Sequence, residues 1–121
     1  MRIRRQPAAL GQFLPEVLQL LSEIEALGYN VETHGQKGFN GVALLSKLRF
    51  DEVNRGLPGD DTDEQARFIE GVFSTDKGAL RVASLYLPNG NPIDDEKKFP
   101  YKLSWMARLE RWATLRAARR G

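Results

Sequence analysis

The sequence contains no cysteine and a single histidine, and these two shortages exclude several kinds of chemistry. Without a thiol the chain forms no disulfide, offers no thiolate to a metal and has no cysteine nucleophile. One imidazole, that of His34, is too few for a two-histidine metal site, although it could act alone as a base. The simpler interpretation is that His34 only closes a strand.

Long apolar runs are also absent, so no segment of the sequence is expected to cross a bilayer. The basic start MRIRR lacks the apolar region and the cleavage site of a secretory signal. We therefore expect a cytoplasmic protein with no membrane partner, which the lack of cysteine also fits. The 121 residues, 41% hydrophobic and 28% charged, suffice for one globular domain at most.

Positive charge is concentrated at the end of the chain, although the formal net charge is only +2. Besides the acid Glu110, the segment 102–121 carries a set of basic residues: Lys102, Arg108, Arg111, Arg116, Arg119 and Arg120. A basic end is compatible with a nucleic-acid partner. An arginine-rich helix face is more often a solvated surface, however, so this feature carries little weight alone.

Two helices are predicted from apolar spacing. Residues 13–27 place one apolar face at three- and four-residue intervals: Leu14, Val17, Leu18, Leu21 and Ile24. Pro15 suits the first turn of this helix and Gly28 its end. A second helix is expected from about Lys97, with an apolar stripe formed by Trp105, Met106, Leu109, Trp112 and Ala113. Arg116 interrupts that stripe, so the residues after it are expected to be unpacked.

Four strands are predicted between the helices. Residues 29–34 alternate and residues 41–46 are apolar throughout, which indicates a hairpin joined by the loop GQKGFN. Residues 67–73 and 79–87 form two more strands around the turn STDKG. The stretch 54–66 gathers glycine, proline and acids and is expected to be a surface loop.

The last of these strands ends with Tyr86 and Leu87, directly before Pro88 and an Asn-Gly turn. Its apolar residues fall on both faces, so both faces are expected to be covered. Tyr86 could be structural, with its ring in the core and its hydroxyl in water, or it could belong to a site. From this stretch alone the structural interpretation is favoured.

Two loops carry residues typical of ligand sites. In HGQKGFNG, residues 34–41, glycines allow close backbone approach and Lys37 and Phe39 suit phosphate and base, yet a glycine-rich hairpin turn is the simpler interpretation. No Gly-Lys-Ser or Gly-Lys-Thr follows, which excludes a P-loop. The acidic cluster Asp60, Asp61, Asp63 and Glu64 lacks the ligand spacing of an EF-hand, which favours a solvated loop.

Three ordered segments carry a resemblance to a known family: IEALGYNVETHGQKGFNGVALLSK, RGLPGDDTDEQARFIE and YLPNGNPIDDEKKFPYKLSWMARLERW. Together they resemble the middle of exodeoxyribonuclease III, the abasic-site endonuclease and 3′-exonuclease of the endonuclease/exonuclease/phosphatase superfamily. The similarity runs over residues 24–112, whereas residues 1–23 and 113–121 diverge. It implies an α/β fold: a single partial domain of the two-sheet α/β sandwich, mostly antiparallel, with a helix at each end.

The resemblance changes the interpretation of Tyr86, which it places near the scissile phosphate as a catalytic residue. It also implies a set of DNA contacts: Asn89, Lys98, Lys37, Gly38, Phe39, Asn40 and Arg67. The expected partner is double-stranded DNA with abasic sites or 3′ ends. A phenol and an amide suit such a site because both donate hydrogen bonds to a phosphoryl oxygen whose charge grows toward the transition state.

The departures from the family concern its metal chemistry. Family members use Mg²⁺ or Mn²⁺, with an Asn and a Leu-Gln-Glu motif early and Gly-Asp-x-Asn and Ser-Asp-His motifs late, and none of these motifs is present here. We therefore assign no metal ligand and expect no metal to bind well. The chain is interpreted as an internal segment lacking both ends of the family domain, with an exposed sheet face that favours self-association.

Two functions follow from this combination, and the sequence leaves open whether the chain is an enzyme. The first is a Mg²⁺-dependent DNA-repair nuclease, expected to be inactive as these 121 residues because both the metal ligands and the water-activating base are missing. The second is a non-catalytic remnant that binds the DNA backbone.

Overall fold

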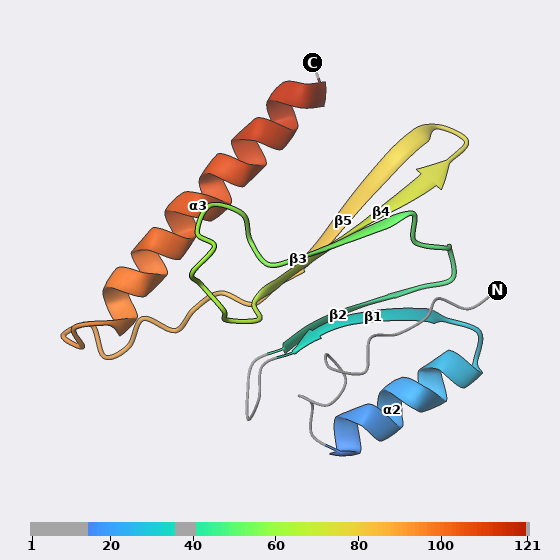
Figure 1. Ribbon diagram of the computed structural model, residues 1–121, viewed down its shortest axis with the longest axis horizontal. Coiled ribbons are helices and arrows are strands. Elements are labelled where there is room, and N and C mark those ends of the chain that lie inside the picture. The colour runs from blue at the N-terminus through green and yellow to red at the C-terminus, as the bar shows by residue number, and fades with distance from the viewer. Residues whose placement is uncertain (1–14, 36–40, 121) are drawn as a thin grey trace. The chain divides into compact units, whose positions relative to one another are not determined.

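The computed structural model describes residues 15–35 and 41–120, and it divides them between two compact units (Figure 1). Unit 1 lies within Met1–Gly56 and Gln65–Tyr86, and unit 2 within Leu57–Glu64 and Leu87–Gly121. Among the described residues, unit 1 contains one helix and the five strands, whereas unit 2 contains a loop and the long C-terminal helix.

The predicted α/β class is confirmed, with a helix near each end and every strand pair antiparallel. Unit 1 contains α2 (Pro15–Ala26), followed by β1 (Asn30–Gly35) and β2 (Gly41–Ser46), which form a two-stranded sheet. A second sheet has the order β3-β4-β5, built from β3 (Glu52–Arg55), β4 (Phe68–Thr75) and β5 (Gly78–Leu85).

Helix α2 forms as its apolar spacing predicts. Pro15 begins it, and Gly28 follows its end with a φ of 96°, a left-handed conformation that glycine adopts without steric cost. Leu21 is buried at the centre of the apolar face. The helix contacts β1, so this face covers the two-stranded sheet (Figure 1).

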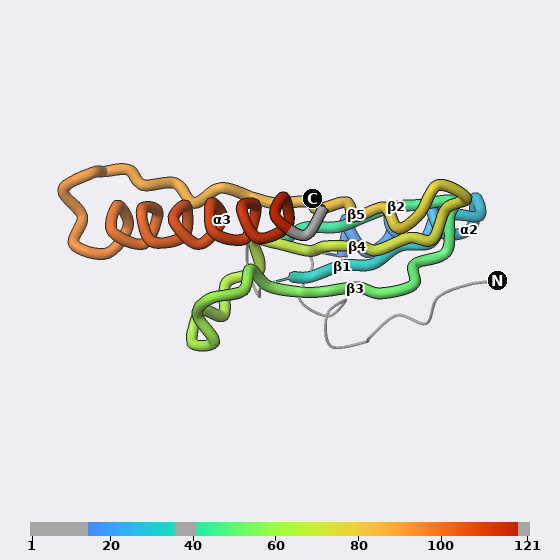
Figure 2. Tube along the Cα trace, turned by 90° about the horizontal axis from the view of Figure 1, so that it is seen from above, coloured from blue at the N-terminus to red at the C-terminus, as the bar shows by residue number. Residues whose placement is uncertain are grey.

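The two sheets of unit 1 pack face to face, with β2 against β4 and β5 (Figure 2). At the contact, a Cβ built on Gly71 would lie 2.7 Å from Phe50 Cε1 and 3.1 Å from Leu44 Cδ1. Phe50 also meets Phe73, with ring centroids 4.8 Å apart. The missing side chain of Gly71 therefore lets the sheets approach, and the aromatic pair fills the space beside it.

Sequence patterns do not predict β3, because this strand is short and polar. Residues 54 and 55 lie in it and not in the predicted surface loop. Its register pairs Glu52 with Val72 and Arg55 with Ile69. Phe68–Phe73 of β4 are all buried, which fits a central strand with neighbours on both sides.

The expectation that both faces of the strand before Tyr86 are covered is wrong. In β5 the exposed fractions are 47% for Leu80, 39% for Val82 and 40% for Leu85. The reason is topological, because β5 is the edge of its sheet and pairs only with β4 among the described strands.

An exposed apolar edge strand is a template for pairing with another chain. We expect concentration-dependent association in sedimentation velocity, and we expect Val82→Lys to abolish it because a charge on the edge opposes pairing. Thr114→Lys, on an exposed position of unit 2, adds the same charge and serves as the control. Association that survives Val82→Lys, or none in the unmodified chain, would contradict this prediction.

Unit 2 consists of the loop Leu57–Glu64 and α3 (Lys98–Arg120), preceded by the connection that begins at Leu87. Asp95 caps the helix, since its Oδ1 accepts hydrogen bonds from the N–H groups of Lys97 (2.8 Å) and Lys98 (2.9 Å). These bonds, that from Lys97 first, lower the pKa of Asp95. No helix in the described part of the chain has the length and apolar character needed to span a membrane.

Helix α3 continues past Arg116, where the apolar stripe was expected to fail. The guanidinium of Arg116 lies over the ring of Trp112, 5.6 Å from its centroid, so the arginine stem and charge are accommodated on the same face. Of the predicted stripe, Trp105 is buried, whereas Met106 is 42% exposed. The helix therefore continues without a continuous buried stripe.

Candidate functional site

Tyr86 and Arg67 lie side by side at the sheet end where β4 begins and β5 ends. Because the register pairs Phe68 with Leu85, the next pair outward is Arg67 with Tyr86. The Tyr86 N–H donates to the Arg67 carbonyl at 2.9 Å, and Arg67 Nη1 donates to the Tyr86 carbonyl at 3.3 Å. The antiparallel ladder thus brings together two of the predicted site residues that are far apart in sequence.

The two side chains also contact each other. The guanidinium carbon of Arg67 lies 5.0 Å from the centroid of the Tyr86 ring, a cation–π distance. Tyr86 remains 48% exposed. Its ring is therefore outside the core, whereas the structural interpretation placed the ring inside the core. A stacked guanidinium limits the orientations of the ring and places a fixed positive charge beside the phenol.

Gln65 is a positioning residue that sequence reasoning missed. Its Oε1 accepts a hydrogen bond from Arg67 Nε at 2.7 Å, and its carbonyl accepts from the Arg67 N–H at 3.1 Å. Gln65 thus binds the Arg67 guanidinium through Nε, while Nη1 donates to the Tyr86 carbonyl. The only signal in the sequence was its separation of two residues from Arg67, which many polar pairs share.

Asn89 lies in unit 2, in the turn between Pro88 and Gly90. Its Oδ1 accepts a hydrogen bond from the Asn91 N–H at 3.1 Å, which leaves the exposed Nδ2 group as a donor. Gly90 is buried, and a Cβ there would lie 2.9 Å from Lys102 Cδ and 3.1 Å from Phe99 Cδ1. The turn therefore packs on the first turns of α3 through a position without a side chain.

Lys98 is the first residue of α3 and its side chain is exposed. Its backbone N–H is bound by Asp95, so the ammonium is carried at a capped helix start in the same unit as Asn89. Four other predicted DNA contacts, Lys37, Gly38, Phe39 and Asn40, lie outside the described residues.

Two carboxylates of the loop Leu57–Glu64, those of Asp60 and Asp63, accept hydrogen bonds within unit 2. Asp63 Oδ2 accepts hydrogen bonds from Tyr101 Oη at 2.8 Å and from Arg108 Nη2 at 2.5 Å. Asp60 Oδ1 accepts from the Thr62 hydroxyl and N–H, and these bonds, the hydroxyl first, lower the pKa of Asp60. Asp60 and Asp61 are exposed, as expected for a solvated loop. Asp63 is nearly buried, so the expectation of a solvated cluster is wrong for that residue.

These donors do not fit the divalent metal that the family resemblance implies. Within residues 15–35 and 41–120, no three His, Cys, Asp or Glu side chains are grouped so that they could hold a metal ion. The best-placed carboxylate, Asp63, already accepts from a guanidinium and a phenol. No catalytic step is therefore assigned to a metal held by these residues.

A second polar cluster joins the two sheets of unit 1. Arg55 Nη2 donates to Glu32 Oε1 at 2.6 Å, and Arg55 Nε donates to the Thr33 carbonyl at 2.7 Å. Burial, and to a smaller extent the positive charge of Arg55, lowers the pKa of the neighbouring His34 below its usual 6.5. His34 is thus held neutral near pH 7, opposite Val42 in the hairpin.

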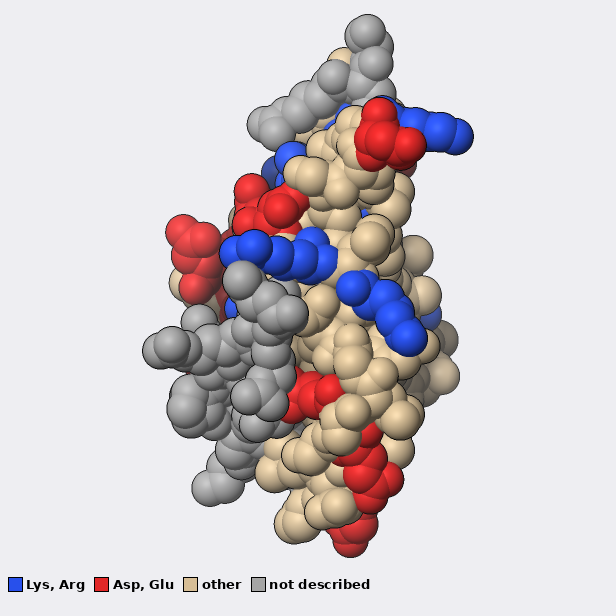
Figure 3. Space-filling model, turned by 90° about the vertical axis from the view of Figure 1, so that its right-hand side faces the viewer, with Lys and Arg blue, Asp and Glu red and all other residues tan. Residues whose placement is uncertain are grey.

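Positive charge on one face of the molecule is dispersed. In Figure 3 the blue lysine and arginine side chains stand apart from one another, among tan and red ones. The described residues visible on this face form no continuous basic patch.

Comparison with known proteins gives matches that cover part of each relative. No protein-family model matches the chain. Exodeoxyribonuclease III of Haemophilus influenzae is 43% identical over 88 residues, which is 73% of this chain and 33% of that protein. The chain therefore spans about a third of the length of this curated relative.

Solved structures match in fold as well. One is a variant of the 3′ phosphatase NExo from Neisseria, bound to a product DNA hairpin, with a TM-score of 0.71 and 33% identity. The match covers 81% of this chain and 36% of the NExo chain. The 3′-5′ exonuclease NExo from Neisseria meningitidis has a TM-score of 0.70 and 27% identity, with coverages of 95% and 52%. An AP endonuclease from Archaeoglobus fulgidus has a TM-score of 0.61 and 35% identity, with coverages of 79% and 33%.

Proposed function

We propose that this chain serves as the phosphate-facing part of a DNA-repair nuclease. The premise is that the chain belongs to the exodeoxyribonuclease III family in sequence and in fold. The observation that carries the proposal is the contact of Arg67 with Tyr86 at the end of β4 and β5. That contact joins a hydrogen-bond donor to a fixed cation at an exposed strand end, which suits a phosphodiester.

The proposed substrate is double-stranded DNA with abasic sites or 3′ ends. Support comes from relatives: one similar structure holds a product DNA hairpin, and another is an AP endonuclease. In our proposal the Tyr86 hydroxyl and the Arg67 guanidinium both donate to non-bridging phosphate oxygens. In unit 2, Asn89 Nδ2 and the Lys98 ammonium are proposed as further donors to phosphates of the DNA backbone.

Hydrolysis needs more than these donors. A phosphodiester is cleaved when a group activates water and a positive centre offsets the growing charge, and metal ions commonly supply both. The described carboxylates do not group to hold such an ion. We therefore propose that these 121 residues bind the DNA backbone and do not cleave it without carboxylates supplied from elsewhere.

The first prediction concerns cleavage. We expect the chain, incubated with a duplex containing one abasic site and with Mg²⁺ or Mn²⁺, to produce no more nicked strand on a denaturing gel than an EDTA control does. The same null result is expected for a duplex with a recessed 3′ end. Metal-dependent nicking that Tyr86→Phe removes would contradict the proposal, because it would show a complete active site within these residues.

The second prediction concerns binding. We expect the affinity for duplex DNA, measured by fluorescence anisotropy, to fall steeply with salt as phosphate contacts release counterions. Arg67→Ala should lower the magnitude of the log–log salt slope by about 1 because one phosphate contact is lost. Tyr86→Phe should weaken binding while leaving the salt slope unchanged, since it removes a hydroxyl and no charge.

Arg49→Ala is the matched control for that experiment. Arg49 is exposed and lies just before β3. The Asp51 N–H, near Arg49, donates to the Val72 carbonyl, so Arg49 is at the end of the sheet opposite to Tyr86. Its replacement removes the same charge without touching the proposed site. Equal slopes for Arg49→Ala and Arg67→Ala, or binding independent of salt, would remove the assignment of Arg67.

A further inference from the structure

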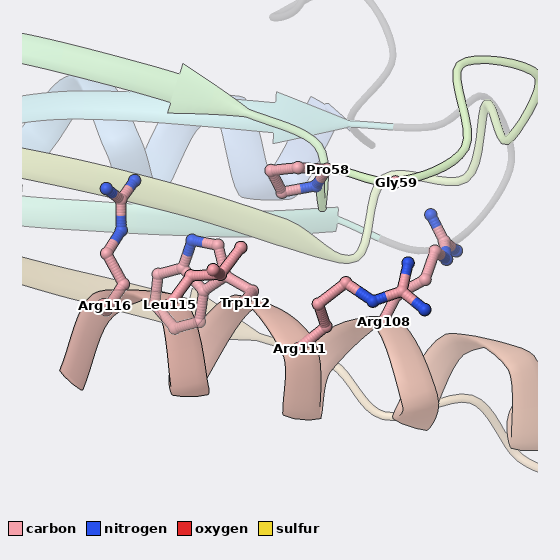
Figure 4. A pocket seen from close by; sticks show the side chains of 7 residues that line it. All are labelled: Pro58, Gly59, Arg108, Arg111, Trp112, Leu115 and Arg116. Carbon is pink, nitrogen blue, oxygen red and sulfur yellow. The ribbon is translucent and has the colours of Figure 1, made fainter. Parts of the chain in front are cut away.

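Unit 2 contains a pocket between the loop Leu57–Glu64 and α3, with a volume of about 310 Å³. Its lining comes from one loop turn and one helix face: Pro58, Gly59, Arg108, Arg111, Trp112, Leu115 and Arg116 (Figure 4). The helical members recur at three- and four-residue spacing, so they share one side of α3. The volume is at the lower end of the range for small-ligand sites, about 300–1,000 Å³.

The pocket is built by two close contacts. Gly59 has a φ of 116°, and a Cβ there would lie 3.0 Å from Arg108 Cδ, so the loop backbone approaches the arginine stem where a side chain would not fit. Asp63 then holds the loop to α3 through Arg108 and Tyr101. The walls are thus set by contacts within unit 2 and exist without a ligand.

The lining of the pocket is rich in arginine. Three of its lining residues are arginines and none is acidic, and the carboxylate bound to one of them is that of Asp63, which engages Arg108. Arg108 is nearly buried, yet its Nε has no hydrogen-bond partner among the described residues. Arg111 is exposed and has no ion-pair partner in the same part of the chain. An exposed guanidinium in a pocket lined by arginines favours an anion.

The other walls are apolar or aromatic. The indole of Trp112, with Arg116 over it at 5.6 Å, forms a planar wall, and Leu115 and Pro58 add apolar surface (Figure 4). Inorganic phosphate alone would leave this surface in contact with water. A ligand that joins a phosphate to a planar ring would use both the guanidinium donors and the apolar wall.

We propose that this pocket binds a nucleoside monophosphate or a closely similar phosphorylated ring compound. The phosphate accepts hydrogen bonds from Arg111, while the ring lies against Trp112 and Leu115. The inference goes beyond the nuclease function and does not depend on it, since the pocket uses none of the residues assigned to the DNA backbone.

The test is a titration of the whole chain by isothermal calorimetry with deoxyadenosine monophosphate, inorganic phosphate and deoxyadenosine. We expect saturable 1:1 binding, tightest for the nucleotide. Arg111→Ala should weaken nucleotide binding at least about tenfold because a charge-assisted hydrogen bond is lost. Trp112→Leu should weaken the nucleotide but leave phosphate affinity unchanged, provided that circular dichroism shows α3 intact.

Arg49→Ala, which removes an exposed arginine from unit 1, is the matched control and should leave nucleotide affinity unchanged. Equal effects of Arg49→Ala and Arg111→Ala would overturn the proposal in favour of general electrostatic attraction. Equal affinities for phosphate and nucleotide, or no binding, would also overturn it. So would an oligomer in sedimentation velocity that Arg111→Ala dissociates, because the pocket would then hold a second copy of the chain. A DNA salt slope that is lowered by Arg67→Ala but unchanged by Arg111→Ala separates this test from that of the nuclease site.

Discussion

Asp63→Ala is expected to destabilise unit 2 by about 3–5 kcal/mol, the usual cost of removing one partner from a buried ion pair. The side chains of Asp63 and Arg108 are each only 9% exposed, so the substitution leaves a nearly buried guanidinium without its counter-charge. It also removes the acceptor of the Tyr101 hydroxyl. The loop Leu57–Glu64 should then detach from α3.

Tryptophan fluorescence during urea unfolding measures this effect selectively, because both tryptophans of the chain, Trp105 and Trp112, are in α3. Asp63→Asn, which keeps an acceptor oxygen but loses the charge, should fall between the alanine variant and the unmodified chain. Asp61→Ala removes an exposed acid from the same loop and should change stability by less than about 0.5 kcal/mol. Equal stabilities for the Asp61 and Asp63 variants would contradict the structural role of Asp63.

Arg55→Ala is expected to have an effect of the same size in unit 1, again about 3–5 kcal/mol. The side chain of Glu32 is 5% exposed, and Arg55 supplies the cation that it contacts at 2.6 Å. Without Arg55 a buried carboxylate remains, and the link from β3 to the Thr33 carbonyl of β1 is lost. Amide hydrogen exchange in β1 and β3, together with urea unfolding followed by circular dichroism, measures the loss.

The double variant Glu32→Leu with Arg55→Leu distinguishes a lost attraction from a buried, unpaired charge. If the cost comes from the unpaired carboxylate, replacing both partners by apolar side chains should recover most of the stability. A double variant as unstable as Arg55→Ala would show that the ion pair itself contributes the stability.

Local sequence patterns predicted most of the elements because their causes are local. The apolar intervals of Val17, Leu18 and Leu21 determine the buried face of α2, and Gly28 ends it wherever the helix lies. The hairpin β1-β2 followed equally from its alternation and its glycine-rich loop. By contrast, β3 has too few apolar residues for a periodic signal and exists because β4 offers it a partner.

The candidate site was predicted only in part. The resemblance indicated Tyr86 and Arg67 as separate residues, and the ladder between β4 and β5 makes them neighbours. Gln65 had no distinguishing signal, because its role depends on where the Arg67 guanidinium lies. The exposure of β5 was predicted wrongly, since apolar composition does not reveal whether a strand is at the edge of a sheet.

The sequence by itself determined the chemistry that is available: no thiol, one imidazole, a basic C-terminal segment and the helix and hairpin periodicities. Tertiary structure alone decided which groups meet, such as Asp63 with Arg108, 45 positions apart, and Arg55 with Glu32, 23 apart. The physical reason is that helix and turn preferences act over a few residues, whereas an ion pair or a pocket depends on strand register and packing between distant segments.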